Sequence, residues 1–321
     1  MLEEARRLER FSPPFAFSAF FSPEDTLLCV LAAESALGHL AASVAGGDGR
    51  EPIRVAELTS GSGLVGLHLL GLDLSARLLG LDIDKEATRV STRNARLLGV
   101  SSRAEFVQSD LWSDGAGELL ASAMPQLMVC NPPYIPEPPD GAMEIEAGAG
   151  PNGTAHLLRA LELTDALQPE SLALSWCSVS APGAIVRDAE RKGYRLDTLY
   201  LTVIADGEYS GSVHKYLRGL PHAYISEQPD TIAAVAPDES ASFAYLLFAG
   251  AFSRRKNGDV QAGAAGHVER ICSDFARAGV TTLATATGPF ALHCSILNRW
   301  DELQLRIILH GSVTNQQLPY A

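Results

Sequence analysis

The segment VAELTSGSG, residues 55–63, decides the fold predicted for this chain. It joins a short β-prone run, VAEL, to a turn of small residues and glycines, and an apolar helical pattern follows over 63–72. Glycine lets the backbone turn tightly and approach a ligand, and the first amides of the next helix lack partners within the helix. The segment therefore predicts a strand, a ligand-facing turn and a helix, which is the first βα unit of a parallel sheet.

The same alternation continues from residue 53 to about residue 203. Several of the β-prone runs are apolar throughout, which is typical of strands covered on both faces. The expected strands are 53–58, 76–83, 104–108, 127–130, 171–177 and 196–203, and the expected helices are 63–72, 85–98, 117–123, 154–167 and 182–192. This order predicts a doubly wound, mostly parallel α/β sheet.

The two ends of the chain have a different pattern. Residues 1–50 predict an N-terminal helical segment, in which Ser22 caps a long apolar helix over 26–45. Residues 51–252 form the expected main domain, with a loop-like insert over 204–240, and residues 253–321 form a C-terminal extension. The elements expected beyond residue 240 are a strand at 243–252, a turn at 255–259, a helix at 266–278 and strand-like runs at 281–285, 291–296 and 304–309.

Composition narrows the possible classes of function. The 321 residues are 46% hydrophobic and 20% charged, and 25 Lys and Arg against 38 Asp and Glu give a net charge of −13. Such a chain can bury its own core, and its acidic excess disfavours nucleic acid without excluding it. The five cysteines form no close pair, and neither a signal peptide nor a membrane-spanning apolar run is apparent. We therefore expect a globular, cytoplasmic protein outside the membrane.

Acidic residues end three successive strands: Glu57, Asp82 and Asp110. The carboxyl ends of parallel strands meet at one edge of the sheet, so these side chains are expected to face one ligand. Glu57, followed by Gly61 and Gly63, would repel a phosphate and suits an amine-bearing ligand. Asp82 is placed to accept from ribose hydroxyls, and Asp110 can accept from the exocyclic amine of adenine.

Apolar neighbours complete this expected binding site. Ile83 follows Asp82, and Leu111 and Trp112 follow Asp110, so apolar neighbours can sandwich an adenine ring. One acid after a strand is more often a helix N-cap, but three together favour a nucleoside without phosphates. The pattern therefore predicts S-adenosylmethionine as cofactor. The histidines and cysteines lack paired metal spacing, so no metal site is expected.

The fourth expected strand, LMVC, runs directly into NPPYIP at residues 131–136. Pro132 and Pro133 hold the backbone extended and remove two amide donors. The Asn131 side-chain oxygen and the Pro132 carbonyl can both accept from a planar NH2 group, while Tyr134 can stack on its plane. This predicts a site that orients an amide or amine nitrogen toward a methyl sulfonium without a strong base.

Together, residues 57–63, Asp82, Asp110 and NPPYIP resemble the class I methyltransferases that act on planar amide or amine nitrogens, especially the release-factor glutamine methyltransferases. FSPEDTLL at 21–28 and EAGAGPNG at 146–153 are similar to further segments of that family, so the resemblance covers about residues 21–203. It implies a Rossmann-like sheet of seven strands with an antiparallel last strand, here 243–252. It also implies an S-adenosylmethionine-dependent enzyme whose protein substrate is the GGQ glutamine of a translation release factor.

The chain departs from this family at places that leave the methyl acceptor open. Thr59, within the expected cofactor-binding turn, occupies a position usually held by glycine, only about 50 residues precede that turn, and a long insert separates the last two strands. The alternatives are adenine N6 of RNA or DNA, a small metabolite, or a noncatalytic partner protein. The oligomeric state and the roles of residues 204–240 and 253–321 stay open at this point.

Overall fold

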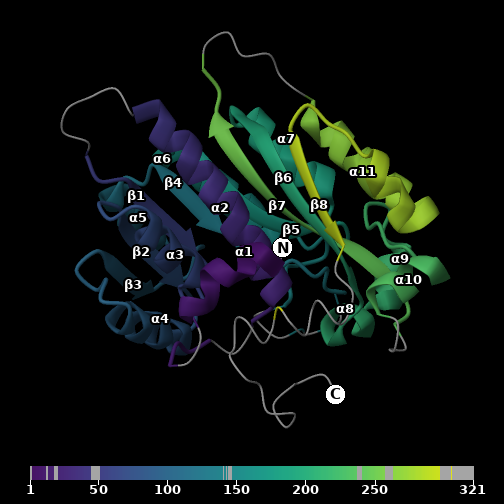
Figure 1. Ribbon diagram of the computed structural model, residues 1–321, viewed down its shortest axis with the longest axis horizontal. Helices are drawn as coiled ribbons and strands as arrows, with labels where there is room; N and C mark the ends of the chain where they lie inside the picture. Colours follow the sequence, from purple (N-terminus) through teal and green to yellow (C-terminus); the bar gives the residue numbers. More distant parts are fainter. Residues whose placement is uncertain are drawn as a thin grey trace.

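An eight-stranded β-sheet lies at the centre of the computed structural model, with helices on both of its faces (Figure 1). The structure describes residues 2–11, 14–17, 21–44, 51–139, 141, 143, 147–236, 241–256, 263–296 and 305. The strands are β1 (Arg54–Leu58), β2 (Arg77–Asp82), β3 (Ala104–Gln108), β4 (Leu127–Cys130), β5 (Ser171–Cys177), β6 (Tyr194–Ala205), β7 (Ala244–Arg254) and β8 (Ala291–Ile296). Their order in the sheet is β3-β2-β1-β4-β5-β7-β6-β8.

The sheet has a parallel half and a mixed half. Strands β1 to β5 are parallel to their neighbours among themselves, and β7 is antiparallel to both β5 and β6. The antiparallel strand expected at 243–252 is therefore confirmed. The expected number of seven strands is corrected to eight, because β8 pairs in parallel with the outer side of β6. The result is a doubly wound, Rossmann-like sheet with one strand more than expected.

Two apolar clusters fill the space between the sheet and its helices. One lies under α2 (Pro23–Val44), α3 (Leu64–Leu72) and α4 (Lys85–Leu97), together with α1 (Leu2–Ala5) and the 3₁₀ helix η1 (Arg6–Phe11). The other lies under α5 (Asp114–Ala123), α6 (Ala155–Leu167), α7 (Pro182–Arg191) and α11 (Ala264–Ala278). Each large apolar side chain buried here contributes about 1.5–3 kcal/mol, so both layers hold the central strands in place.

Helix α2 is the one helix in the described chain that is long and apolar enough to cross a membrane by length and composition. This corrects the expectation that every apolar run is too short. In the structure 61% of that window is buried, and the helix packs against β5, β6, β7 and α3. Packing on the sheet accounts for its apolar composition, since core helices pass the same test.

The C-terminal third differs most from the sequence-based expectation. The described part of the insert, which ends at residue 236, contains three short helices instead of a plain loop: α8 (Glu208–Ser212), α9 (His214–Gly219) and α10 (Pro229–Val235). The run 281–285 is not a strand but the 3₁₀ helix η2 (Gly279–Thr285), because Thr281 and Thr282 donate back to the carbonyls of Ala278 and Gly279. The expected run at 304–309 lies outside the described residues apart from Leu305, and the domain boundaries at 50 and 252 stay predictions.

Candidate functional site

The expected site residues gather at the carboxyl ends of β1, β2 and β4. Strand β1 lies between the other two, and Leu58 pairs with Leu81 on one side and with Cys130 on the other. The turn after β1 is thus flanked by Asp82 and Asn131. Asp110 follows β3, the next strand outward. The topology therefore places the expected cofactor residues and the NPPY segment at one edge of the sheet.

Asp82 ties the glycine turn to the end of β2. Its two carboxylate oxygens accept from the backbone amides of Gly61 at 2.7 Å and Asp84 at 2.9 Å. Burial raises the pKa of Asp82. Each oxygen keeps a lone pair, so the carboxylate can shape the turn and still accept from ribose hydroxyls. The N-cap of α4 is Asp84 and not Asp82, which leaves Asp82 directed toward the turn.

The glycine at the end of this turn is required by space as well as by conformation. Gly63 has φ +74°, and a Cβ there would lie 2.7 Å from the ring of Phe106 on β3. Any other residue would have to displace that ring and adopt the left-handed conformation. Gly63 therefore lets the start of α3 lie close to the strands.

Glu57 is a buried acid with an unsatisfied oxygen. Its side chain is only 4% exposed, and its Oε2 has no hydrogen-bond partner among the described residues. Burial raises the pKa of Glu57 to about 8, hydrogen bonding from the amides of Gly66 and Val65 lowers it, and the charge of Asp82 raises it. A buried carboxylate oxygen that lacks a donor fits an ammonium group, as the amino end of S-adenosylmethionine would provide.

The expected adenine end is more open. Asp110 is exposed, and one of its oxygens accepts from the backbone amide of Trp112 at 2.9 Å. Ile83 is 46% exposed, whereas Leu111 is buried. Trp112, which was expected with Leu111 as an apolar neighbour of the ring, is 50% exposed, and its ring centroid lies 5.0 Å from that of His156 in an edge-on contact. Ile83 and Trp112 thus offer apolar surface to a ring, while Leu111 supports the turn from below.

Asn131 is held by two residues from other elements. Its side-chain amide, oriented by its neighbours, donates to the Asp25 oxygens at 3.0 and 3.3 Å and to Ser175 Oγ at 3.3 Å. Both hydrogens of the amide nitrogen can therefore be used by the protein, which fixes the plane of the Asn131 side chain. Pro132 is buried and Pro133 half-buried, as expected for a fixed backbone.

Asp25, which the sequence indicated only as part of the FSPEDTLL segment, anchors this arrangement. It lies in the first turn of α2 and is 3% exposed. Burial raises its pKa to about 7, hydrogen bonds from Asn131 and Tyr134 lower it, and the neighbouring Glu24 raises it. The available signal was an acid just inside an otherwise apolar helix. Its partner lies 106 positions further along the chain, so no local pattern could reveal the contact.

Tyr134 is more deeply buried than its expected stacking role requires. It is 7% exposed, its hydroxyl hydrogen-bonds Asp25, and burial raises its pKa well above the usual range. Its stacking on an acceptor stays a prediction. The hydrogen bond gives Tyr134 a second role, since it helps to fix the carboxylate that orients Asn131.

We expect Asp25→Ala to lower kcat about tenfold or more, because the Asn131 amide loses its bonds to the carboxylate and keeps only the 3.3 Å one to Ser175. Donor affinity should change little. Asp25→Asn is the matched control, since its oxygen can still accept from Asn131, and it should recover most of the activity. Steady-state kinetics with donor titration by calorimetry measure both. An unchanged kcat in Asp25→Ala, or an equal loss of donor affinity, would contradict the positioning role.

A glycine-rich loop supports the NPPY segment from behind. Ile135 and Glu137 donate to the carbonyls of Ala147 and Gly150, and the Ala149 amide donates back to Ile135. Gly153 has φ +68°, and a Cβ there would lie 2.3 Å from the Tyr134 carbonyl oxygen. The part of EAGAGPNG that the structure describes, from Ala147 onward, therefore acts as a brace for the acceptor segment.

We expect Gly153→Ala to destabilise the protein by more than the roughly 1–2 kcal/mol of left-handed strain alone, because it also collides with backbone. Gly150→Ala is the matched control: Gly150 has φ +75°, and its nearest neighbour to an added Cβ is 3.7 Å away. Urea unfolding of both variants measures the difference. Equal midpoints would argue against the close contact.

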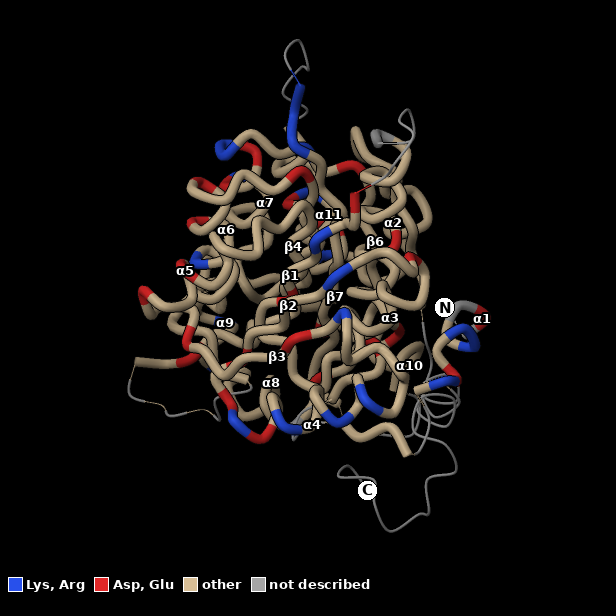
Figure 2. Tube along the Cα trace, turned by 90° about the vertical axis from the view of Figure 1, so that its left-hand side faces the viewer, with Lys and Arg blue, Asp and Glu red and all other residues tan. Residues whose placement is uncertain are grey.

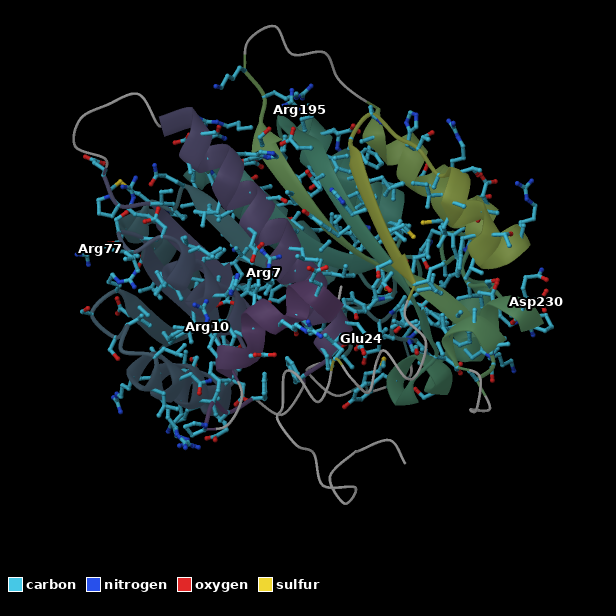
Figure 3. All side chains as sticks on the ribbon, in the orientation of Figure 1. Arg7, Arg10, Glu24, Arg77, Arg195 and Asp230 are labelled. Atoms are coloured by element: carbon cyan, nitrogen blue, oxygen red, sulfur yellow. The ribbon has the colours of Figure 1, made fainter. Side chains whose placement is uncertain are left out.

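Hydrogen bonds attach the N-terminal segment to helix α3 and to the glycine turn. Arg10 donates to the carbonyl of His68 on α3 at 3.0 Å (Figure 3). The Asn94 side chain donates to the carbonyls of Ala16 at 2.7 Å and Ser62 at 3.0 Å, and accepts from the Ala16 amide. Asn94 therefore joins the N-terminal segment to the glycine turn, a role that its sequence position does not reveal.

The insert after β6 contacts the segments that lie next to NPPY. The Tyr216 hydroxyl donates to the carbonyl of Pro151 in the brace loop at 3.0 Å. Tyr224 exchanges hydrogen bonds with Ser178, just after β5, at 2.6 and 2.9 Å. The insert thus contacts both segments that flank NPPY.

The fold and the site define an α/β protein in which Glu57, Asp82 and Asn131 gather at one edge of a mostly parallel sheet. No protein-family model matches the chain. It is 42% identical over 93 residues to the release factor glutamine methyltransferase of Rhodospirillum rubrum, covering 29% of this chain and 27% of that protein. It is 36% identical over 122 residues to that of Chlorobaculum tepidum, covering 37% and 40%.

A relative with a different substrate shares a longer segment. The 4-amino-L-phenylalanine/4-methylamino-L-phenylalanine methyltransferase of Streptomyces pristinaespiralis is 30% identical over 169 residues, 49% of each chain. The chain thus spans about a quarter to a half of the length of these curated relatives. Similar solved structures include a ribosomal protein L11 methylase from Lactobacillus delbrueckii (15% identity, TM-score 0.39, 74% and 82% covered) and the Mtq2–Trm112 complex of E. cuniculi (16%, 0.36, 72% and 97%).

Proposed function

We propose that this protein is an S-adenosylmethionine-dependent N-methyltransferase that acts on a planar amide or amine nitrogen. The observation that carries the proposal is the fixed Asn131 amide, whose nitrogen is held by the Asp25 carboxylate and by Ser175 Oγ. Across the same strand ends, the buried Glu57 offers an unsatisfied oxygen to an ammonium group. A site that binds the ammonium group of a methyl donor and offers hydrogen-bond acceptors to a substrate NH2 group fits methyl transfer to nitrogen.

The chain's own residues would do the binding and the orienting. S-adenosylmethionine, when bound, supplies an electrophilic methyl group on a sulfonium. Glu57 would hold its amino end and Asp82 its ribose, while Ile83 and Trp112 would face the adenine. The Asn131 side-chain oxygen and the Pro132 carbonyl oxygen would each accept one hydrogen bond from the substrate NH2 group. The nitrogen lone pair would then point at the methyl group. Positioning of this kind accounts for most of the rate in such a displacement.

For the acceptor we propose a glutamine side chain of a protein, of the release-factor type. The similarity to release factor glutamine methyltransferases supports this substrate. Adenine in RNA or DNA is disfavoured by the net charge of −13, and Figure 2 shows Lys and Arg positions scattered among Asp and Glu positions. A protein substrate of this kind also fits the proposed cytoplasmic location.

A small aromatic amine is the second candidate acceptor. The match to the 4-amino-L-phenylalanine methyltransferase covers the larger share of this chain, and an arylamine presents the same planar NH2 geometry. The contact of the insert with the brace loop favours this candidate, since the Tyr216 hydroxyl donates to the Pro151 carbonyl and brings the insert next to the NPPY segment.

Methyl-labelled S-adenosylmethionine tests the proposal. The purified protein is incubated with a GGQ-containing release factor, with 4-amino-L-phenylalanine and with an undermethylated extract, and products are divided by protease, nuclease and a size filter. Protease-sensitive label on the release factor supports the first candidate. Label on the amino acid alone supports the second, and nuclease-sensitive label would overturn both. Absence of label together with absence of donor binding would leave the noncatalytic alternative.

A further inference from the structure

Thr59 has a backbone conformation that its side chain disfavours. Its φ is +56°, in the left-handed region where glycine is at ease and a β-branched residue is an outlier. The other described non-glycine residues with positive φ all flank helices: Met124 and Gln168 are C-caps, and Ala181 is an N-cap. Thr59 has no such explanation. It lies in the turn after β1, at the centre of the proposed donor site.

Side-chain contacts place Thr59 between the donor and acceptor residues. Its Oγ1 donates to the Leu58 carbonyl at 2.5 Å and lies 3.9 Å from Cys130 Sγ. Cys130 is the residue directly before Asn131, and Glu57 lies two positions before Thr59. The hydroxyl hydrogen is therefore used within β1, while the oxygen keeps lone pairs that can accept. The residue is half-buried, so a ligand can reach it.

We propose that Thr59 is a specificity-determining residue for the methyl donor, whose hydroxyl oxygen accepts from the donor's ammonium group beside Glu57. This rests on the proposed function. An ammonium has three hydrogens to donate, and the Glu57 oxygen takes only one of them. A strained residue persists where the strain serves binding, and here a glycine would relieve the strain but supply no acceptor. The proposed gain is a second hydrogen bond to the donor's amino end.

Three substitutions separate the hydroxyl from the backbone. Thr59→Val keeps the shape and the branching but removes the acceptor, Thr59→Ser keeps the hydroxyl, and Thr59→Gly removes both the strain and the side chain. Binding is measured by calorimetry with two probes: S-adenosylhomocysteine, which carries the amino end, and 5′-methylthioadenosine, which lacks it. Thermal unfolding of the ligand-free proteins measures the strain independently of activity.

We expect Thr59→Val and Thr59→Gly to weaken S-adenosylhomocysteine about tenfold and Thr59→Ser to keep wild-type affinity. Affinity for 5′-methylthioadenosine should not change in any variant. Thr59→Gly should unfold at a higher temperature than wild type without ligand. Unchanged S-adenosylhomocysteine affinity in Thr59→Val, an equal loss for both probes, or a lower unfolding temperature for Thr59→Gly would each overturn the inference. Wild-type protein that binds neither probe would overturn the proposed function itself.

Discussion

Asn131→Ala should lower kcat at least about 100-fold, the scale seen when one fixed hydrogen-bonding group is removed from a reacting centre. The substrate NH2 would lose the acceptor that removes its resonance and aims its lone pair. The donor contacts Glu57, Asp82 and the glycine turn would stay intact, so the Kd for S-adenosylhomocysteine should change little. Single-turnover transfer and calorimetry give the two quantities.

Two further measurements make this result specific. Asn152→Ala is the matched control, because Asn152 is an exposed asparagine in the neighbouring brace loop, and its transfer rate should equal that of wild type. Urea unfolding of Asn131→Ala reports whether loss of the bonds to Asp25 and Ser175 has loosened the fold. A loss of donor affinity as large as the loss of rate would show that Asn131 acts on the donor and not on the acceptor.

Glu57 should make donor binding depend on pH. With a pKa of about 8, the ligand-free carboxyl is protonated at pH 6 to 7, whereas an ammonium ligand requires its charged form. Binding should therefore release about one proton, and affinity should strengthen toward tenfold per pH unit up to about pH 8. Glu57→Gln should bind S-adenosylhomocysteine at least about tenfold more weakly and lose this pH dependence. Calorimetry in buffers of different ionisation enthalpy counts the protons.

The raised pKa of Glu57 also determines how the free energy of unfolding changes with pH. The pKa of Glu57 is raised from 4.5, so between pH 4.5 and about 8 the folded protein binds more protons than the unfolded chain. The free energy of unfolding contributed by this group therefore falls as pH rises through that window, and it is fully present below pH 4.5.

The ligand 5′-methylthioadenosine, which has no ammonium group, is the control for the pH dependence of donor binding. It should bind with the same affinity at every pH between 4.5 and about 8. A pH-dependent affinity for that ligand would point to another titrating group.

Local patterns were enough to predict most of the parallel half of the sheet. A strand covered on both faces is apolar throughout, and a sharp turn needs small residues. The strands VAEL and LMVC and the glycine turn could therefore be predicted from neighbouring residues alone. The carboxyl ends of such strands meet at one edge, and for that reason Glu57, Asp82 and Asn131 could be placed together before any coordinates.

Contacts between distant segments could not be predicted in this way. The short helices of the insert, the 3₁₀ turn of Thr281 and Thr282, and the pairing of β8 with β6 all depend on packing or hydroxyl hydrogen bonds that strand propensity does not register. Asp25 likewise gains its role from Asn131, 106 positions away, and Asn94 gains its role from Ala16, 78 positions away.

The sequence by itself therefore determined which chemical groups this protein presents: an acid for an amine, an acid for a ribose, and an amide with a carbonyl for an NH2 group. Only the tertiary structure decided how those groups are held. Asp25 orients Asn131, burial leaves one oxygen of Glu57 unsatisfied, and Thr59 is kept in a glycine-like turn. Residue identity and the spacing of apolar residues can be read from the sequence. Burial and hydrogen-bond direction depend on which remote side chains the folded core brings into contact.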